Sequence, residues 1–396
     1  MKKLIFGYGA TGKSVETYFQ KNNTEYLIYD DDKAVKITDN QKFKDSKFDE
    51  VDEVIISPGI KPTHKLLNEI RSLGLPVKTD IDLFNEIYKG KLIGVTGTNG
   101  KTTLVNLLTG FLNSQGIKAA AVGNVGMSPL EVIDKEYEYI VIELSSFQLY
   151  YLNNLNLHIG IILNIYQDHL DWHKNFDDYL ESKKRIIEFI KNEDGSTKAT
   201  KVNNFFGSLQ PGVITSPVHS EIKEKSKFFD NTVDIFMEVV ERLQLNYQSA
   251  KEYLINSQNS EHRFELVDVH KGITYINDSK STNFNAVSMA TTKVNNGILI
   301  MHGLTKNIDS KDLDISNEIK KIILPKDMKV NLNNIKAEVI ELDSIFDLEE
   351  KLEKNLHFGD TVLFSCGGAS FNDFKNYEER GNFFKSVVSN IKVKNG

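Results

Sequence analysis

Lys91-Leu-Ile-Gly-Val-Thr-Gly-Thr-Asn-Gly-Lys-Thr-Thr103 is the stretch that decides the fold. It begins with a short apolar run that predicts a buried strand, continues into a glycine-rich turn, and leads into apolar residues at helical spacing. A strand, a glycine-rich turn and a helix N-terminus together form an anion cradle, because backbone N–H groups and the helix dipole favour phosphate. We therefore expect the N–H groups of Gly97 to Lys101 to face phosphates, Lys101 to reach the β- and γ-phosphates, and Thr102 to hold Mg²⁺. Val95 replaces the first glycine of the general phosphate-loop pattern, so this is a variant loop.

Composition and charge set outer limits on function. The chain has 396 residues, 40% of them hydrophobic, which suggests two or three domains with ordinary cores. Its formal net charge of −7 gives no overall electrostatic case for nucleic acid or an anionic membrane surface. The single cysteine, Cys366, excludes a disulfide framework and a cysteine-based zinc site and favours a reducing compartment. No apolar run approaches the roughly 18 residues of a membrane-spanning helix, so we expect a cytoplasmic protein with no membrane insertion. No apolar surface stripe stands out, so we expect a monomer.

Strand and helix patterns alternate along the chain in three blocks. This alternation predicts an α/β fold with doubly wound, mainly parallel sheets. The expected domains cover residues 1–89, 90–260 and 261–396. Besides the strand before the phosphate loop, strands are expected at 3–6, 26–29, 54–56, 139–144, 159–163, 273–276, 297–301, 339–342 and 361–364, with a closing helix at 377–388.

A second glycine-rich turn, Gly7-x-Gly9-x-x-Gly12, follows the first expected strand, and Asp30 ends the next one. One interpretation is tight packing between strand and helix. The other is binding of a dinucleotide or a nucleotide-sugar pyrophosphate at the helix N-terminus. An NAD-dependent oxidoreductase would fit this turn, but it would leave the loop at 97–103, Glu143 and His169 without a role.

Polar residues follow two further strands of the middle block, at the edge where the phosphate loop lies. Glu143 ends the strand at 139–144, where a metal-holding acid belongs; the alternative is an acid that caps a neighbouring helix. Asp168 and His169 follow the strand at 159–163. His169 could bind a second Mg²⁺ or contact a phosphate, although magnesium prefers oxygen ligands. We expect Trp172 and His173 to be packing or surface residues.

The segment Tyr179-Leu-Glu-Ser-Lys183-Lys-Arg185 has a helical pattern. Its plain interpretation is a basic helix face in water. Nothing in the spacing distinguishes Lys183 from Lys184 or Arg185.

Taken together, these segments resemble the Mur ligase family of ATP-dependent amide-bond ligases over nearly the whole chain. In the middle block the resemblance is carried by Gly97-Thr-Asn-Gly-Lys-Thr-Thr103, Gly123-Asn124-Val-Gly126, Glu143-Leu-Ser-Ser-Phe-Gln148, Asp168-His169 and Lys183-x-Arg185-Ile186. The ends of the chain resemble the member that adds D-glutamate, through Gly7-x-Gly9-x-Thr11-Gly12, Ser57-Pro58-Gly59, His262-Arg263-Phe264-Glu265, Asn277-Asp278-Ser279-Lys280-Ser-Thr282-Asn283 and Ala369-Ser370-Phe371-x-x-Phe374-Lys-Asn376-Tyr377-x-x-Arg380-Gly381. The Asp-Asn-Pro-Arg string of the member that adds a diamino acid is absent from the sequence.

The resemblance implies a fold, a reaction and two cofactors. The fold would be an N-terminal Rossmann-like UDP-binding domain, a central P-loop ATPase-type domain and a C-terminal Rossmann-like domain for the amino acid. The reaction would join D-glutamate to UDP-N-acetylmuramoyl-L-alanine through an acyl phosphate, in peptidoglycan precursor synthesis. It would use ATP and Mg²⁺, with two ions expected.

The resemblance also implies roles for individual residues. Catalysis would depend on Lys101, Glu143, His169 and Lys183. ATP would contact Gly97, Thr98, Asn99, Gly100, Lys101, Thr102, Thr103, Asn231, Arg263 and Asp278. Metal would be held by Thr102, Glu143, His169 and Lys183, the last as a carbamate. The UDP substrate would contact Gly9, Ala10, Thr11, Ser57, Gly59 and Asn124. D-glutamate would contact Lys280, Thr282, Lys306, Ser370, Phe371 and Tyr377.

The chain departs from the family pattern at several points. Asp30-Asp31-Asp32 stands where the family often has a threonine and an arginine near the nucleotide, and His302-Gly-Leu-Thr-Lys306 replaces a more glycine-rich loop. The middle domain is shortened between residues 192 and 231. A non-catalytic nucleotide-binding regulator would be expected to lack the metal and lysine positions, which are present. A folate polyglutamate ligase would lack the UDP-binding first block.

Overall fold

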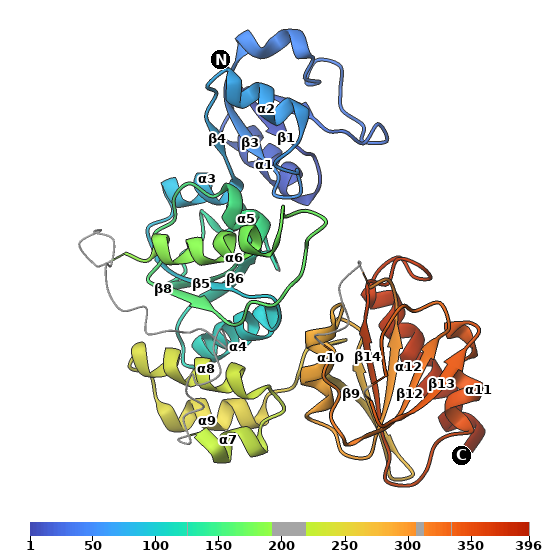
Figure 1. Cartoon of the computed structure of the whole chain (residues 1–396). Helices are drawn as coiled ribbons and strands as arrows, with labels where there is room; N and C mark the ends of the chain where they lie inside the picture. The colour runs from blue at the N-terminus through green and yellow to red at the C-terminus, as the bar shows by residue number, and fades with distance from the viewer. Residues whose placement is uncertain (125, 192–218, 306–312, 334, 396) are drawn as a thin grey trace. The chain divides into compact units, whose positions relative to one another are not determined.

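The computed structural model describes residues 1–124, 126–191, 219–305, 313–333 and 335–395 (Figure 1). The chain folds into two compact units. The first comprises the described parts of Met1–Ile165, His169–Val218 and Asn231–Lys251; the second comprises those of Tyr166–Asp168, His219–Asp230 and Glu252–Gly396. The expected domain boundary after residue 89 lies inside the first unit, and the one after residue 260 lies close to the division at residues 251 and 252. The three-domain boundaries therefore stay a prediction.

The first unit begins with a four-stranded parallel sheet in the order β2-β1-β3-β4. The strands are β1 (Lys2–Phe6), β2 (Tyr26–Tyr29), β3 (Val51–Ile56) and β4 (Val77–Lys78). The helices are α1 (Ala10–Lys21), α2 (Lys65–Ser72) and α3 (Asp80–Ile87), with a 3-10 turn at Asp45–Glu50. Leu4 and Phe6 pack in one buried cluster and Ile5 in another, which is the alternation that a doubly covered strand requires. This confirms the doubly wound pattern expected for the first block.

A second parallel sheet of the first unit has the order β6-β7-β5-β8. Its strands are β5 (Lys91–Thr96), β6 (Ala119–Gly123), β7 (Tyr139–Glu143) and β8 (Ile159–Ile162). The helices of this part of the unit are α4 (Lys101–Ser114), α5 (Ser146–Tyr151), α6 (Phe176–Lys184) and α8 (Asp230–Arg242), with 3-10 turns at Pro129–Val132 and Arg185–Phe189. The division between the two units falls within α9 (Tyr247–Asn256). The sequence did not predict β6, because a run of alanines has little strand preference. The carboxyl ends of β5, β7 and β8 lie at one edge of this sheet.

The two sheets of the first unit share one hydrophobic core through α3. A single buried cluster contains Ile5 and Ile55 of the first sheet, Phe84 of α3, and Leu92 and Ile140 of the second sheet. An unbroken core of this kind makes the two sheets one packed body.

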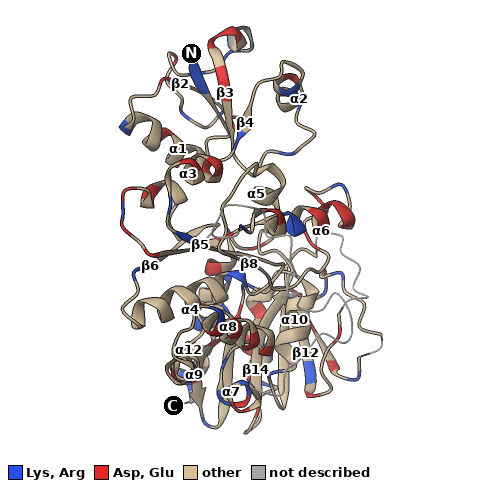
Figure 2. Ribbon diagram, turned by 90° about the vertical axis from the view of Figure 1, so that its left-hand side faces the viewer, with Lys and Arg blue, Asp and Glu red and all other residues tan. Residues whose placement is uncertain are grey.

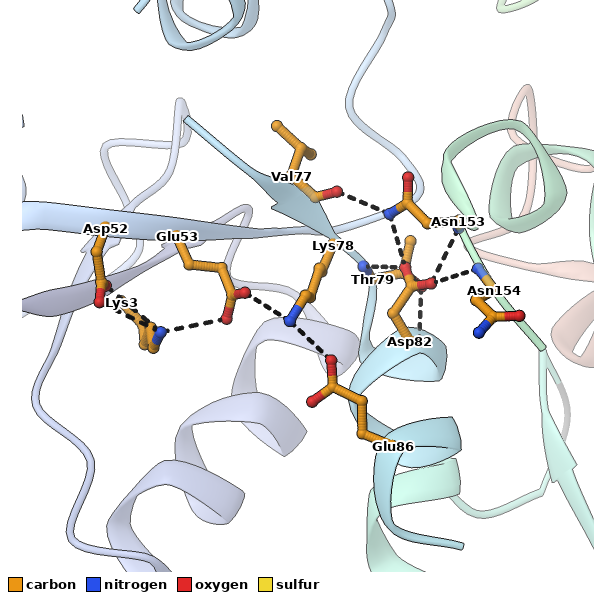
Figure 3. A network of polar contacts seen from close by, with 10 residues as sticks. All are labelled: Lys3, Asp52, Glu53, Val77, Lys78, Thr79, Asp82, Glu86, Asn153 and Asn154. Atoms are coloured by element: carbon orange, nitrogen blue, oxygen red, sulfur yellow. Dashed lines mark hydrogen bonds and ion pairs between the residues drawn. The ribbon is translucent and has the colours of Figure 1, made fainter. Parts of the chain in front are cut away.

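A chain of ion pairs runs across three strands of the first sheet to α3 (Figure 3). Lys78 Nζ lies 2.6 Å from Glu53 Oε1 and 2.7 Å from Glu86 Oε1, and Lys3 Nζ lies 3.4 Å from Glu53 Oε2. These pairs connect β1, β3, β4 and α3. Because Lys78 and Glu86 are 30% and 53% exposed, water screens the contacts and each is worth little on its own.

A buried carboxylate makes the stronger connection in the same view. Asp82 is 4% exposed and completes a capping box with Thr79, whose N–H and hydroxyl it accepts at 2.8 and 2.9 Å. Its other oxygen accepts from the N–H groups of Asn153 and Asn154, both at 2.9 Å, and the amide of Asn153 donates to Oδ2 at 3.2 Å (Figure 3). Asp82 therefore fastens α3 to the segment that follows α5.

The second unit contains a six-stranded sheet in the order β13-β12-β11-β14-β10-β9. The strands are β9 (Glu265–His270), β10 (Ile273–Asp278), β11 (Gly297–His302), β12 (Ile319–Pro325), β13 (Glu338–Leu342) and β14 (Thr361–Gly367). The helices are α7 (Ser220–Lys225), α10 (Phe284–Thr291), α11 (Leu348–Glu353) and α12 (Tyr377–Asn395), with a 3-10 turn at Ile345–Asp347. All strand pairs are parallel except β9 with β10.

The sequence did not predict β9 and β12. The β9–β10 hairpin turns at Lys271 and Gly272, which have φ of +48° and +73°. Two positive φ values are typical of the tight turns that join antiparallel strands, so the Lys-Gly pair was the available signal. Among the described residues, no helix is both long enough and apolar enough to cross a membrane.

Candidate active site

The glycine-rich loop joins β5 to α4 as the sequence predicted, and two glycines give it its shape. Gly97 has a φ of +155°, and a Cβ there would lie 2.9 Å from Cβ of Leu163. Gly100 is the N-cap of α4 with a left-handed φ of +84°. Side chains at these positions would be strained or would clash, so both positions require glycine. The first-turn N–H groups of α4 start at Lys101, where an α-helix offers no internal acceptor.

Part of the predicted phosphate cradle is used differently. The N–H of Thr98 donates to the backbone oxygen of Asn164 at 2.9 Å and to its Oδ1 at 3.1 Å, and the N–H of Asn99 donates to the same Oδ1 at 2.8 Å. These two N–H groups therefore have a buried asparagine, just after β8, as their acceptor. The contact of Thr98 and Asn99 with ATP stays a prediction. Asn164 was missed as a functional residue. The available signal was its place directly after a strand at the loop's edge of the sheet.

Glu143 lies at the centre of the predicted metal site. It is 2% exposed, its Oε2 accepts from Thr102 Oγ1 at 2.8 Å, and its Oε1 accepts from the amide of Asn124 at 3.0 Å. The alternative that Glu143 caps the next helix does not hold, because Ser145 caps α5. Glu143, a predicted metal ligand, thus contacts Asn124, which was predicted to touch the UDP substrate, and Thr102 at the start of α4.

Two lysines converge on one carbonyl of the loop. Lys101 Nζ lies 2.7 Å and Lys183 Nζ 2.8 Å from the backbone oxygen of Gly97. Lys183 is 2% exposed, whereas its neighbour Lys184 pairs with Glu181 at the surface. The structure therefore distinguishes the lysines, which the sequence pattern could not do.

His169 lies beside the same group of residues, in a left-handed conformation with φ of +55°. Its ring centroid is 4.9 Å from that of Phe147 and 6.3 Å from that of Tyr179. Tyr179 in turn shares a 2.8 Å hydrogen bond with the Thr98 hydroxyl and lies under Lys183 Nζ, 4.9 Å from its ring centroid. Across the parts of the chain that the structure describes, no group of three or more His, Cys, Asp or Glu side chains is placed to hold a metal. The predicted metal set has only Glu143 and His169 of these types, and its other members are Thr102 and Lys183.

Three neighbours of this site have structural roles. Trp172 is 8% exposed and its indole N–H donates to the backbone oxygen of Gly59 at 3.2 Å. His173 is buried between Asp178 and Ser146, and burial lowers its pKa. These contacts confirm the packing interpretation of both residues. The Arg185 guanidinium donates to three backbone carbonyls at the end of α5.

The start of α8 lies beside the phosphate loop. Thr232 Oγ1 is 3.9 Å from the position that a Cβ on Gly100 would occupy. The neighbouring Asn231, predicted to contact adenine, is partly exposed in the first turn of α8. That Asn231 contacts adenine stays a prediction; its neighbour Thr232 is the residue that approaches Gly100.

The glycine turn of the first sheet supports both interpretations that the sequence left open. A Cβ on Gly12 would lie 2.2 Å from the backbone oxygen of Gly7, so close packing requires this glycine. The Ser57 hydroxyl donates to the same oxygen at 2.7 Å. Gly9 is the N-cap of α1 without a side-chain cap, and Ala10 beyond it is exposed, which leaves the helix start accessible to an anion.

Asp30 serves the turn itself. Its Oδ2 accepts from the N–H of Tyr8 at 2.5 Å, and its Oδ1 accepts from the N–H of Asp32 at 2.8 Å. Asp31 Oδ2 accepts a hydrogen bond from His64 Nε2 at 3.0 Å, while His64 Nδ1 accepts from the N–H of Leu66. The first aspartate of the run therefore fixes the turn, and Thr11 in the first turn of α1 remains partly exposed.

In the second unit, Asp278 ends β10 and is buried. Its Oδ1 accepts from the N–H of Phe264 at 3.0 Å and its Oδ2 from the Ser365 hydroxyl at 2.8 Å. Burial raises the pKa of Asp278 to about 7, and the nearby charge of Arg263 opposes that rise. Asp278 and Arg263, both predicted to contact ATP, are thus brought together within this unit.

The predicted amino-acid pocket is partly assembled. Lys280 Nζ lies 3.6 Å from the ring centroid of Tyr377, a cation–π contact. Thr282 is partly exposed, Ser370 is 3% exposed and Phe371 is 73% exposed. Lys306, the remaining predicted member, lies outside the described residues.

Arg380 was missed by the sequence reasoning, although it is the largest buried side chain of its unit. The guanidinium has 0% exposure and donates to the backbone oxygens of Ser279, His302 and Gly368 at 2.7, 3.0 and 2.9 Å. These residues follow or end β10, β11 and β14, three neighbouring strands. Arg380 therefore holds together the loops that carry the predicted pocket.

Two solved structures with the same fold are distant from this chain in sequence. The chain is 13% identical to the MurF ligase from Thermotoga maritima solved with ADP, with a TM-score of 0.53, covering 100% of this chain and 95% of that one. It is 16% identical to a pseudomurein peptide ligase type C from Methanothermus fervidus, also with a TM-score of 0.53, covering 99% and 100%. At these identities the likeness shows the fold.

Residues 95–205 match the Mur ligase middle domain, and the chain belongs to the Mur ligase family. Over nearly its whole length it is similar to one particular kind of member. It is 30% identical to the UDP-N-acetylmuramoylalanine--D-glutamate ligase of Buchnera aphidicola subsp. Acyrthosiphon pisum (strain Tuc7), covering 98% of each chain. It is 28% identical to the ligase of that name from Thermosipho melanesiensis, covering 100% of this chain and 99% of the relative.

Proposed function

We propose that this chain is an ATP-dependent ligase that joins D-glutamate to UDP-N-acetylmuramoyl-L-alanine, a step of cytoplasmic peptidoglycan precursor synthesis, and acts as a monomer. The observation that carries the proposal is similarity over 98% of the chain to a relative of that name. The phosphate loop with Lys101, Thr102 and Glu143 at one sheet edge supports the ATP-dependent part.

A carboxylate does not react with an amine in water, because its oxygen is a poor leaving group. In the proposed reaction a carboxylate oxygen of the UDP substrate attacks the γ-phosphorus of ATP, ADP leaves, and an acyl phosphate forms. Lys101 and the first-turn N–H groups of α4 would neutralise charge on the transferred phosphoryl group. The two N–H groups bonded to Asn164 would keep the loop rigid, so that its shape is set before ATP binds.

The residues at the sheet edge fit magnesium. Glu143 offers buried carboxylate oxygens and Thr102 a hydroxyl, and oxygen is the ligand that Mg²⁺ prefers. An ion held by these two residues would supply positive charge that stabilises the transferred phosphoryl group. His169 and Lys183 would serve a second ion.

A carbamate on Lys183 would remove an unfavourable arrangement. Two ammonium groups on the single carbonyl of Gly97 repel each other, and burying the one on Lys183 is costly. Reaction of the neutral Lys183 amine with CO₂ forms an N–C bond and releases a proton, which converts a cation into an anionic oxygen ligand. Lys101 would then have an anionic neighbour instead of a cationic one.

The second step forms the amide. The amine of D-glutamate attacks the carbonyl carbon of the acyl phosphate, phosphate leaves, and the nitrogen loses a proton. Lys280, Thr282, Lys306, Ser370, Phe371 and Tyr377 would hold the amino acid. Lys280 would pair with an acidic group of the substrate while the ring of Tyr377 keeps its ammonium in place.

Phosphate release tests the proposal directly. It would be measured with ATP, Mg²⁺ and UDP-N-acetylmuramoyl-L-alanine, adding D-glutamate, L-glutamate, L-lysine or no amino acid. We expect release with D-glutamate alone. Release with another amino acid would retain the ligase chemistry and overturn the pocket assignment. No release, with bicarbonate present, would overturn the proposed reaction.

A further inference from the structure

The segment that departs from the family pattern before Lys306 begins with a buried histidine. His302 ends β11 and has 0% exposure. Its Nε2 lies 2.9 Å from Asp373 Oδ2, and its Nδ1 lies 3.5 Å from Arg380 Nη1. The ring of Phe374 packs against it, with ring centroids 5.5 Å apart. None of the roles assigned above uses this imidazole.

The surroundings of His302 decide which nitrogen carries its proton. A carboxylate can only accept, so Nε2, which faces Asp373 at 2.9 Å, carries the hydrogen and donates it. The amide nitrogen of Asn372 lies farther from the same Nε2, at 3.4 Å. Nδ1 is then the nitrogen without a hydrogen, and it faces the guanidinium of Arg380. Burial lowers the pKa of His302, in agreement with a neutral ring of this tautomer. The bond is directional and joins a rigid strand end to a loop carboxylate.

That carboxylate belongs to the segment with two predicted pocket residues. Asp373 follows Ser370 and Phe371, and its N–H donates to the backbone oxygen of Ser370 at 3.3 Å. The same segment is bonded to the loop after β11 by the paired backbone bonds of Leu304 and Ala369, both 2.8 Å. It is therefore held at one end by backbone and at the other by His302.

The loop after β11 and the loop after β14 are closely packed where Leu304 and Ala369 are hydrogen-bonded. A Cβ on Gly303 would lie 2.3 Å from the oxygen of Ala369. Beyond Ala369 the side chain of Phe371 is 73% exposed. The outer part of the segment is held by the bond between His302 and Asp373 and by Phe374, whose ring packs on His302 and whose N–H donates to the backbone oxygen of Ser370 at 3.0 Å.

We propose that His302 is a positioning residue that, through Asp373, sets the loop of Ser370 and Phe371 for the incoming amino acid. The inference rests on the proposed function and adds a residue to it. Asp373 is 34% exposed, so changing it leaves no buried cavity and the fold tolerates the test.

The experiment compares Asp373→Ala, Asp373→Asn and the unchanged chain in the phosphate-release assay, with D-glutamate, ATP and the UDP substrate varied in turn. We expect Asp373→Ala to raise KM for D-glutamate about tenfold, the effect of one lost hydrogen bond to a charged group, with KM for ATP unchanged. Asp373→Asn keeps an oxygen acceptor and should stay within about twofold of the unchanged chain. His357→Ala is the matched control, because His357 pairs with Asp360 in the same unit but is 73% exposed.

Each other outcome overturns the inference in a recognisable way. An unchanged KM for D-glutamate in Asp373→Ala shows that the bond does not position the loop. Asp373→Asn behaving like Asp373→Ala shows that charge matters and position does not. A rise in all three KM values together with a lower Tm shows general loss of structure. If the unchanged chain itself shows no D-glutamate-dependent release, the proposed function fails and the inference fails with it.

A double variant checks that both residues act through one contact. His302→Ala should raise KM for D-glutamate as Asp373→Ala does, and the double variant should raise it no further than His302→Ala alone. Additive effects would overturn the proposed connection between His302 and Asp373.

Discussion

Replacing Asp82 with alanine should lower the free energy of unfolding of the first unit by about 4 kcal/mol. The buried carboxylate accepts from three backbone N–H groups, those of Thr79, Asn153 and Asn154 (Figure 3). Alanine leaves these donors without their acceptor, at about 1–3 kcal/mol for each one that stays buried; the bond to Thr79 is also half of the capping box. If water reaches one of the three N–H groups, the other two at about 2 kcal/mol each bring the sum to about 4 kcal/mol.

Two further variants separate the parts of this sum. Asp82→Asn keeps an oxygen for Asn153 and Asn154 but places an amide N–H₂ against the N–H of Thr79, so about half of the loss is expected, about 2 kcal/mol. Glu86→Ala is the control, because Glu86 lies on the same helix, is 53% exposed and pairs with Lys78; its loss should stay below about 1 kcal/mol.

Urea denaturation followed by tryptophan fluorescence is a suitable assay. Trp172 is the single tryptophan, is 8% exposed and is hydrogen-bonded to Gly59, so it reports on the joint between the two sheets. The midpoint should fall in the order Glu86→Ala, Asp82→Asn, Asp82→Ala while the slope m stays constant. An Asp82→Ala protein within about 1 kcal/mol of the unchanged chain would refute the reasoning, as would equal losses in Asp82→Ala and Glu86→Ala.

Three other changes give independent tests. The raised pKa of Asp278, about 7, means that its contribution to stability is present at low pH and is lost as the pH rises through 7. In urea titrations between pH 5 and 8, the free energy of unfolding of Asp278→Asn should therefore gain about 3 kcal/mol relative to that of the unchanged chain. Parallel pH profiles of the two proteins would contradict this. Asn164→Ala frees the loop N–H groups and should raise KM for ATP about tenfold with little change in KM for D-glutamate; a similar rise in both would indicate general damage. Removing dissolved CO₂ should lower the rate of phosphate release, and added bicarbonate should restore it. The rate of Lys183→Ala should be at least about tenfold lower than that of the unchanged chain and should not respond to bicarbonate. A Lys183→Ala protein that still responds would place the carbamate elsewhere.

The parts of the fold that the sequence predicted are those fixed by local pattern. The loop between β5 and α4 was found because apolar period, glycines and a helix start follow one another within thirteen residues of sequence. Glu143 was placed beside it because the carboxyl ends of parallel strands meet at one sheet edge. The β9 strand was missed because its turn, Lys271-Gly272, is a weak signal, and β6 because alanine suits a helix as well as a strand.

The helix that carries Lys183 shows where local pattern stops. Lys183, Lys184 and Arg185 are neighbours in sequence, yet one reaches Gly97, one pairs at the surface with Glu181 and one caps α5. Their different roles follow from which face of the helix is packed, and that depends on segments far away in the sequence. The resemblance to a family supplied the role of Lys183; the spacing alone did not.

Arg380 extends the same argument to residues that neither pattern nor resemblance assigned. Its carbonyl acceptors follow or end β10, β11 and β14, and no spacing within the sequence links them to α12. The strand order β11-β14-β10 does link them, because it places three strand ends side by side, each with backbone oxygens that have left the sheet. Such oxygens need donors when buried, and a guanidinium offers five in one plane. Once the order of the strands is known, a cationic side chain near the start of α12 is therefore expected to donate to these oxygens. His302, which ends β11, lies beside that side chain.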